Sequence, residues 1–120
     1  MAVPFVLVVE DEAMIRLVLV EGLEDAGFSV AQAESADAAV ALLADGAPAL
    51  AVVTDVRMPG SMDGLGLAAW MREHRPMVPI FITSGYATPP NAGMLNPAIA
   101  AVVPKPYKLG ELVALVTSRV

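Results

Sequence analysis

Polar residues with complementary chemistry follow four short apolar runs of this sequence. Glu10-Asp11-Glu12 follows one run, Asp55 ends a second, Thr83-Ser84 ends a third and Lys105 follows a fourth. Carboxylates that gather at one place repel each other unless a cation or a proton intervenes. Their oxygens suit a hard divalent cation, of which magnesium is the usual choice and manganese the alternative. The residue types therefore predict a metal-assisted site with an ammonium and a hydroxyl close by.

Asp55 is the residue best placed to react. Its carboxylate could attack phosphorus while the metal, Lys105 and a hydroxyl hold the phosphoryl oxygens. Each group also has a simpler interpretation when it is taken singly: the acidic triplet could cap a helix, Asp55 could belong to a turn, and Lys105 could be a solvated surface lysine. The common location of these groups after apolar runs favours the reactive interpretation.

The elements that must position these groups alternate between strands and helices. Strands are predicted at Phe5–Val9, Phe28–Ala33, Ala49–Thr54, Val78–Ser84 and Ala98–Val103, and helices at 12–26, 36–45, 64–74 and 109–120. Ser35 and Asp63 can cap the second and third of these helices. The order predicts an α/β fold, a doubly wound five-stranded parallel sheet with helices on both faces. In such a sheet, sites form beyond the carboxyl ends of the strands, where the polar groups are expected.

The segment between the fourth and fifth predicted strands is less regular. It contains prolines at positions 89, 90 and 97 and a glycine at position 93. Proline removes a backbone donor and disrupts a helix interior. A fourth helix, if it forms, is therefore expected to be short or irregular.

The composition describes one acidic domain, which we expect to span residues 1–120. The chain is 57% hydrophobic, carries a formal net charge of -6 and has no cysteine. The charge argues against direct nucleic-acid binding, and the lack of cysteine excludes disulfides and thiolate metal sites. No apolar run is long enough to span a membrane, and the acidic N-terminal region does not look like a signal peptide. A cytoplasmic protein without membrane contacts is expected.

The chain resembles a response-regulator receiver domain of two-component signalling, of the single-domain type, with a flavodoxin-like receiver fold. The resemblance rests on the acidic pair, "TDVRMPGSMDG", "ITSGY" and "KPY", in this order, and it covers essentially all 120 residues. It implies that Asp55 is the phospho-acceptor. It also implies that Asp11 is a direct magnesium ligand, that Glu10 acts through water, and that the backbone carbonyl of Arg57 is the third protein ligand.

The resemblance assigns two further groups around the phosphoryl site. Lys105 matches the lysine that contacts the phosphoryl group, and the Lys105-Pro106 bond is expected to be cis. The switch hydroxyl commonly lies five residues after the proline that opens the fourth strand, which selects Ser84 after Pro79, with Thr83 as the alternative.

Two departures from the family pattern concern the turn after Asp55 and the switch. The loop "MPGSMDG" is one residue longer than the common form. The fifth strand lacks the usual aromatic before the lysine, since residues 101–103 read Ala-Val-Val, so Tyr86 or Tyr107 is the candidate replacement.

The resemblance implies a signalling module that a histidine kinase or a histidine phosphotransfer protein phosphorylates, and that then changes its binding to a downstream protein. It implies no enzymatic activity beyond self-phosphorylation and self-dephosphorylation, and the sequence is compatible with a homodimer. Two alternatives stay open. One is a pseudo-receiver that only binds a partner. The other is a magnesium-dependent phosphatase with an aspartyl nucleophile, although such enzymes usually place a second aspartate where this chain has Arg57.

Overall fold

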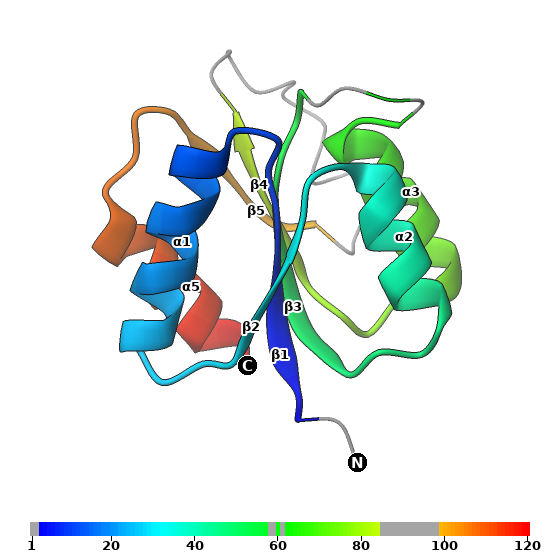
Figure 1. Ribbon diagram of the computed structural model, residues 1–120, viewed down its shortest axis with the longest axis horizontal. Helices are drawn as coiled ribbons and strands as arrows, with labels where there is room; N and C mark the ends of the chain where they lie inside the picture. The colour runs from blue at the N-terminus through cyan, green and yellow to red at the C-terminus, as the bar shows by residue number, and fades with distance from the viewer. Residues whose placement is uncertain (1–2, 58–59, 61, 85–98) are drawn as a thin grey trace.

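The computed structural model describes residues 3–57, 60, 62–84 and 99–120. These residues form a central parallel sheet with helices on both faces, which confirms the predicted α/β class (Figure 1). In chain order the elements are β1 Phe5–Val9, α1 Ala13–Asp25, β2 Val30–Ala33, α2 Ala36–Ala44, β3 Ala49–Asp55, α3 Gly64–His74, β4 Ile80–Ser84, β5 Ile99–Pro104 and α5 Leu109–Arg119. The expected fourth helix falls within 85–98, outside the described residues.

The strands are arranged in the order β2-β1-β3-β4-β5, and each neighbouring pair is parallel. The chain leaves β1 toward one edge of the sheet and leaves β3 toward the other, so the switch point lies between β1 and β3. At this point Val9 pairs with Thr54, the residue before Asp55. The two acidic segments predicted to form the site therefore lie side by side.

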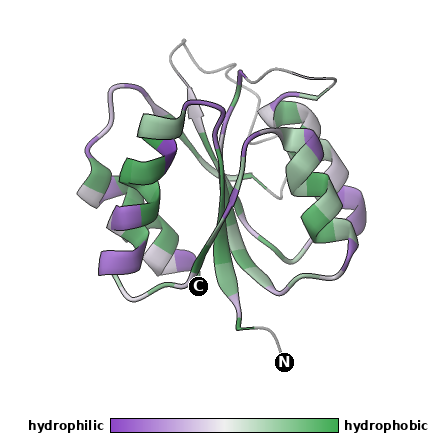
Figure 2. Cartoon of the chain, in the orientation of Figure 1, coloured by the Kyte–Doolittle hydropathy of each residue, from purple (hydrophilic) through white to green (hydrophobic). Residues whose placement is uncertain are grey.

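Two hydrophobic cores hold the helices against the sheet. On one face, side chains such as Val8, Val53 and Phe81 pack against α1 and α5. On the other face, side chains such as Val52 and Ile82 pack against α2 and α3. The strands alternate between these faces, as a sheet covered on both sides requires. Figure 2 accordingly shows the central strands as hydrophobic along most of their length.

The predicted helix caps are confirmed. Ser35 Oγ accepts a hydrogen bond from the Ala38 N–H at 3.1 Å, and Asp63 Oδ1 accepts one from the Gly66 N–H at 2.8 Å. Gly27, which follows α1, has a φ of 99°, a left-handed conformation that suits glycine. These local signals fix where the helices begin and end, and hence where the intervening strands deliver their last residues.

Several predicted boundaries were wrong by one or two residues. The fourth strand begins at Ile80 and not at Val78, because Pro79 lacks a backbone N–H and contributes only its carbonyl, which accepts from Val52 N–H at 3.0 Å. The second strand begins at Val30 and not at Phe28, whose N–H closes the end of α1 by donating to Leu23 O at 3.1 Å. The carboxyl ends of the strands, where the site lies, are little affected.

Candidate phosphoryl-acceptor site

Asp55 and Lys105 form an ion pair at the carboxyl end of the sheet. Lys105 Nζ lies 2.8 Å from Asp55 Oδ2, and the two side chains are 27% and 15% exposed. The Lys105 N–H also donates to the Ser84 carbonyl at 2.7 Å, which ties the lysine to the end of β4. The Lys105-Pro106 bond is cis, as predicted. Lys105 is therefore a partly buried residue that is paired with Asp55, and the alternative interpretation as a solvated surface lysine is wrong.

The electrostatic balance of the pair favours the charged lysine. Burial lowers the pKa of the Lys105 ammonium, but the hydrogen bond and the negative charge of Asp55 outweigh this effect and leave that pKa above its ordinary value. Glu10 adds to the same attraction. Lys105 is thus a permanent positive charge against the Asp55 carboxylate.

Glu10 is almost completely buried beside this pair, with 2% of its surface exposed. Burial raises the pKa of its carboxyl to about 7, and its hydrogen bond with Asp11 and the charge of Asp55 act in the same direction. The Glu12 N–H, which donates to Glu10 Oε2 at 3.2 Å, and the charge of Lys105 act in the opposite direction. Burial and the neighbouring acidic groups therefore favour the protonated form of Glu10 in the metal-free protein.

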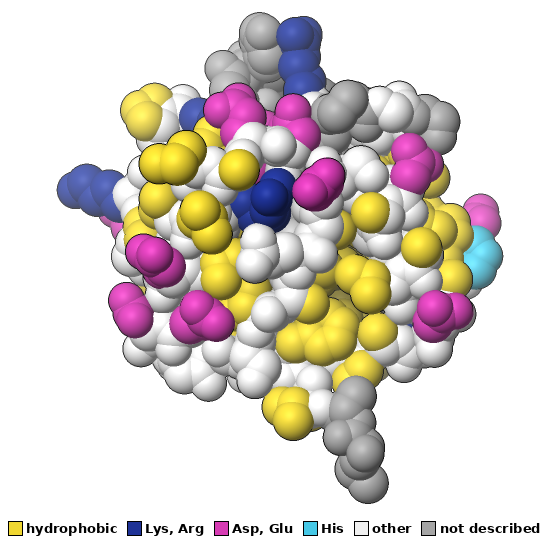
Figure 3. Space-filling model, in the orientation of Figure 1, with side chains coloured by type: hydrophobic (Ala, Val, Ile, Leu, Met, Phe, Trp, Pro, Cys, Tyr) yellow, Lys and Arg dark blue, Asp and Glu magenta, His cyan; other side chains and the backbone are white. Residues whose placement is uncertain are grey.

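The acidic triplet does not cap α1. Glu12 occupies the N-cap position, but its side chain makes no capping hydrogen bond to any described residue. Asp11 is exposed, whereas Glu10 is buried. In Figure 3, acidic side chains lie near the carboxyl ends of the strands with basic side chains among them, and further acidic side chains are spread over the rest of this face. This arrangement disfavours the capping interpretation of the triplet.

Arg16 is a residue of this region that the sequence analysis missed. From the first turns of α1 its guanidinium reaches back over the acidic turn: Nη1 donates to the Glu10 carbonyl at 2.7 Å and Nε donates to Gln32 Oε1 at 3.0 Å. A basic residue one helical turn after an acidic triplet is the signal that could have drawn attention to it.

Both hydroxyl candidates are buried at the end of β4. Thr83 pairs with Asp55 in the β3–β4 register, and Ser84 pairs with Pro104 of β5. Alternation along the strand places Thr83 on the face of Phe81 and Asp55, and Ser84 one residue nearer the edge on the face of Ile82. The choice of Ser84 over Thr83 stays a prediction.

The loop after β3 returns the chain close to Asp55. Arg57 lies two residues beyond the strand and is exposed. The start of α3 then approaches β3 again, where the Gly64 N–H donates to the Val56 carbonyl at 2.8 Å. The lengthened part of the loop includes positions 58, 59 and 61, which lie outside the described residues. The backbone of Arg57 is thus placed near the end of β3, where a third oxygen ligand was expected.

The donor set fits a magnesium ion that keeps several of its waters. In the described part of the chain, no group of three or more carboxylate, histidine or cysteine side chains is placed to hold a metal alone. Magnesium is usually bound through one or two carboxylates with water in the remaining positions. The feature that favours a cation here is the proximity of the almost completely buried Glu10 carboxyl to the carboxyl groups of Asp11 and Asp55.

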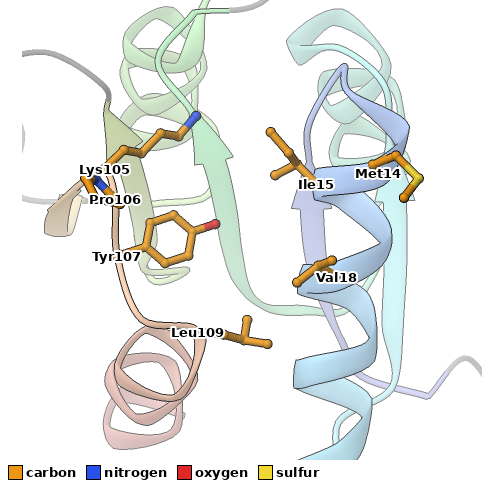
Figure 4. A pocket seen from close by; sticks show the side chains of 7 residues that line it. All are labelled: Met14, Ile15, Val18, Lys105, Pro106, Tyr107 and Leu109. Atoms are coloured by element: carbon orange, nitrogen blue, oxygen red, sulfur yellow. The ribbon is translucent and has the colours of Figure 1, made fainter.

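A groove of about 610 Å³ adjoins the site between α1 and the segment that joins β5 to α5. Ile15 and Val18 line it on one side, and Lys105, Tyr107 and Leu109 on the other. In Figure 4 the Lys105 amine reaches toward the tip of β3, and the Tyr107 ring lies in the groove below the amine. Tyr107 packs against the α1–α5 core, while Tyr86, the other candidate aromatic, lies outside the described residues.

Glu10→Gln should stabilise the metal-free protein at high pH and not at low pH. A carboxyl whose pKa is raised to about 7 on folding binds more protons in the folded state, so its contribution to the free energy of unfolding falls as the pH rises from about 4.5 to about 7. Glutamine cannot ionise and resembles the protonated Glu10 side chain, so the variant does not lose stability as the pH rises. We expect a gain of roughly 1–3 kcal/mol at about pH 8 and little change at about pH 4. Urea unfolding in the presence of a chelator measures the difference in free energy of unfolding between Glu10→Gln and the wild type. An equal difference at both pH values would contradict the prediction.

Comparison with known proteins places this arrangement in a family. A family model for the response regulator receiver domain matches residues 6–117. The transcriptional regulator NtrC of Salmonella typhimurium is 35% identical over 118 residues, which covers 92% of this chain and 24% of that protein. The chain therefore spans about a quarter of the length of this curated relative.

Solved structures agree with the sequence comparison. A response regulator receiver protein of Sinorhizobium medicae has a TM-score of 0.84 and 33% identity, with coverage of 98% of this chain and 93% of that one. TrrA of Thermotoga maritima, solved in complex with Mg²⁺ and beryllofluoride, has a TM-score of 0.84 and 27% identity, with coverage of 96% and 97%. In the described part of the chain, no helix is long and apolar enough to cross a membrane.

Proposed function

Because the chain belongs to the response regulator receiver domain family, we propose that Asp55 accepts a phosphoryl group and that this modification switches the binding of a partner protein. The observation that carries the proposal is the Asp55–Lys105 pair at 2.8 Å, placed at the switch point of the sheet beside the buried Glu10. The acceptor, a fixed cation and an acidic cluster meet at the edge where α/β sheets hold their ligands.

The proposed reaction is transfer from a phosphohistidine. An oxygen of the Asp55 carboxylate forms the new P–O bond as the P–N bond breaks, and the electron pair of that bond stays on the histidine nitrogen. Lys105 lies within reach of Asp55 and would stabilise the charge on the phosphoryl oxygens. The Ser84 hydroxyl, or that of Thr83, would donate to another of these oxygens. In self-dephosphorylation, water attacks the same phosphorus as the P–O bond to Asp55 breaks, which releases inorganic phosphate and restores the Asp55 carboxylate.

Magnesium is the proposed cofactor, with manganese as the alternative. Asp11, Asp55 and the carbonyl of Arg57 would bind it directly, and Glu10 would act through water. When bound, the ion supplies charge neutralisation for the phosphoryl oxygens. TrrA, which was solved with Mg²⁺ and beryllofluoride, shares 27% identity with this chain and supports the assignment by analogy.

The proposed phosphoryl donor is a histidine kinase or a histidine phosphotransfer protein. The proposed target is a downstream protein that distinguishes the phosphorylated form of this chain from the unphosphorylated form. The whole-protein activity of NtrC is not carried over, since the chain matches 24% of that protein. Residues 1–120 as one receiver domain, a cytoplasmic location and the absence of direct nucleic-acid or membrane binding remain expectations from the sequence.

Incubation with acetyl phosphate and Mg²⁺ should add the mass of one phosphoryl group to the intact protein. The carboxylate of Asp55 is the nucleophile, so Asp55→Asn should take up none, and a chelator should abolish uptake by the wild type. Intact-protein mass spectrometry reads all three samples. Phosphorylation of the Asp55→Asn protein at another residue would overturn the assignment of the acceptor.

A further inference from the structure

The turn between β1 and α1 that contains Glu10 and Asp11, here called the acidic turn, is held in place by Arg16. No step of the proposed reaction uses this arginine. Glu10 and Asp11 must present their carboxylates in a fixed direction, yet both belong to a short turn, where the backbone is less constrained than in a strand. Two described contacts fix the peptide units of Glu10. Its N–H donates to the Ala33 carbonyl of β2 at 3.0 Å, and its carbonyl accepts from Arg16 Nη1 at 2.7 Å.

Arg16 is itself anchored at both ends. Its own N–H donates to the Glu12 carbonyl at 2.9 Å within the first turn of the helix, and its Nε donates to Gln32 Oε1 at 3.0 Å. Gln32 lies on β2, where it pairs with Val8 of β1. The guanidinium thus joins the start of α1, the acidic turn and the edge strand β2, and its rigid planar donors suit this two-point contact.

The Glu10 carbonyl belongs to the peptide bond that joins Glu10 to Asp11. Fixing this oxygen fixes the orientation of that peptide plane, and through it the directions in which the two side chains leave the backbone. The hydrogen bond is charge-assisted and partly buried, so it is among the stronger contacts in the turn. A loose Arg16 would leave the acidic pair free to turn away from Asp55.

We propose that Arg16 is a positioning residue that, with Gln32, orients Glu10 and Asp11 for binding of the divalent cation. The proposal rests on the proposed function and deepens it, because it assigns the magnesium site a support outside its ligands. Partners that orient metal ligands typically change metal affinity by 10–100-fold when they are removed. The alternative role of Arg16 is purely electrostatic: a positive charge near the site repels the cation.

Two substitutions of Arg16 separate these roles. Arg16→Lys keeps the charge but cannot reproduce the planar two-point contact, whereas Arg16→Gln removes the charge as well. If Arg16 positions the turn, both variants bind Mg²⁺ about tenfold more weakly in calorimetric titration. If Arg16 acts only through its charge, Arg16→Lys binds as the wild type does and Arg16→Gln binds more tightly, and this outcome would overturn the proposal.

Arg75→Lys is the matched control. Arg75 also donates from its guanidinium to two main-chain carbonyls, those of Leu43 at 3.0 Å and Ala47 at 2.9 Å, but these lie at the other end of the sheet, where α2 ends. The control loses the same kind of contact without touching the acidic turn. Its Mg²⁺ affinity should equal that of the wild type, and an equal loss in Arg75→Lys would assign the Arg16 effect to general loosening of the fold.

Gln32→Ala and amide hydrogen exchange keep the test independent of the function. Gln32 is exposed, so its removal spares the core and should weaken Mg²⁺ binding less than Arg16→Lys does. In metal-free protein, Gln32→Ala and Arg16→Lys should both exchange the amide hydrogen of Glu12 faster than the wild type does. That N–H bonds to the Glu10 side chain, which would be less well fixed in either variant. Unchanged exchange at this amide would overturn the proposal that Arg16 positions the acidic turn. Failure of wild-type protein to become phosphorylated would instead overturn the proposed function and leave this measurement valid.

Discussion

Lys105→Met should slow phosphorylation of Asp55 by about 100-fold while it tightens binding of Mg²⁺. The ammonium lies 2.8 Å from Asp55 Oδ2, so it is placed to stabilise negative charge that develops on phosphoryl oxygens attached to that carboxylate. Removal of one such preorganised donor commonly costs about 10²–10³-fold in rate. Methionine keeps most of the length and volume of the side chain, so the neighbouring packing should survive.

The expected gain in Mg²⁺ affinity follows from competition for the same carboxylate. Glu10 and Asp55 both interact with the charge of Lys105, and a divalent cation must share Asp55 with it. Without the ammonium, the acidic cluster repels itself more strongly and attracts a cation better. Rate and affinity should therefore move in opposite directions, which general damage to the site would not produce.

Lys108→Met is the matched control for this prediction. Lys108 lies three residues along at the start of α5, where it is exposed and makes no side-chain capping bond to any described residue. The Lys108→Met substitution should leave both the rate of phosphorylation of Asp55 and the affinity for Mg²⁺ unchanged. The measurements are acetyl phosphate labelling followed by mass spectrometry, and calorimetric Mg²⁺ titration. A Lys105→Met protein that loses both rate and affinity would contradict the role of Lys105 as the competing cation.

The sequence predicted the fold because its signals were local. The β-branched runs are buried on both faces in the central strands, and Ser35 and Asp63 cap their helices as expected. The rule that sites form at the carboxyl ends of strands then predicted that Asp55 and Lys105 lie at the same edge of the sheet. The boundary errors were of one or two residues, as at the start of β4, where the Pro79 carbonyl bonds to the neighbouring strand but no N–H does.

Contacts that depend on register could not be predicted in the same way. The hydrogen bonds of Arg16 join a helix, a turn and an edge strand, and only the pairing of β1 with β2 brings Gln32 within reach. The close approach of α3 to the end of β3 likewise depends on how the intervening loop returns. The sequence shows a glycine at position 64 but not which atoms require it.

Gly64→Ala should destabilise the protein by about 3 kcal/mol, more than any other glycine-to-alanine change in the helices. A Cβ at position 64 would overlap the Asp55 carbonyl oxygen and would lie 3.0 Å from Val56 Cα. Both are backbone atoms of the strand end, so no side-chain rotation can relieve the overlap. Either α3 or the end of β3 must move.

The carbonyl that meets the new methyl group belongs to the proposed phospho-acceptor. Thr54 Oγ1 also donates to this oxygen at 3.0 Å, so displacement of Asp55 would disturb the strand end and not only the loop. We expect phosphorylation to slow in the fraction of Gly64→Ala protein that stays folded, because the carboxylate leaves its position against Lys105.

Two other helical glycines provide graded controls in urea unfolding. Gly66→Ala, in the same turn of α3, would place its Cβ 2.7 Å from Met62 Cγ, a flexible side chain that can move away. Gly110→Ala, in the first turn of α5, would meet no described atom within 4 Å. Alanine gains about 0.5–1 kcal/mol over glycine within a helix. The free energy of unfolding should therefore rise for Gly110→Ala, change little for Gly66→Ala and fall steeply for Gly64→Ala, and equal effects at positions 64 and 66 would contradict the argument that backbone contact sets the cost.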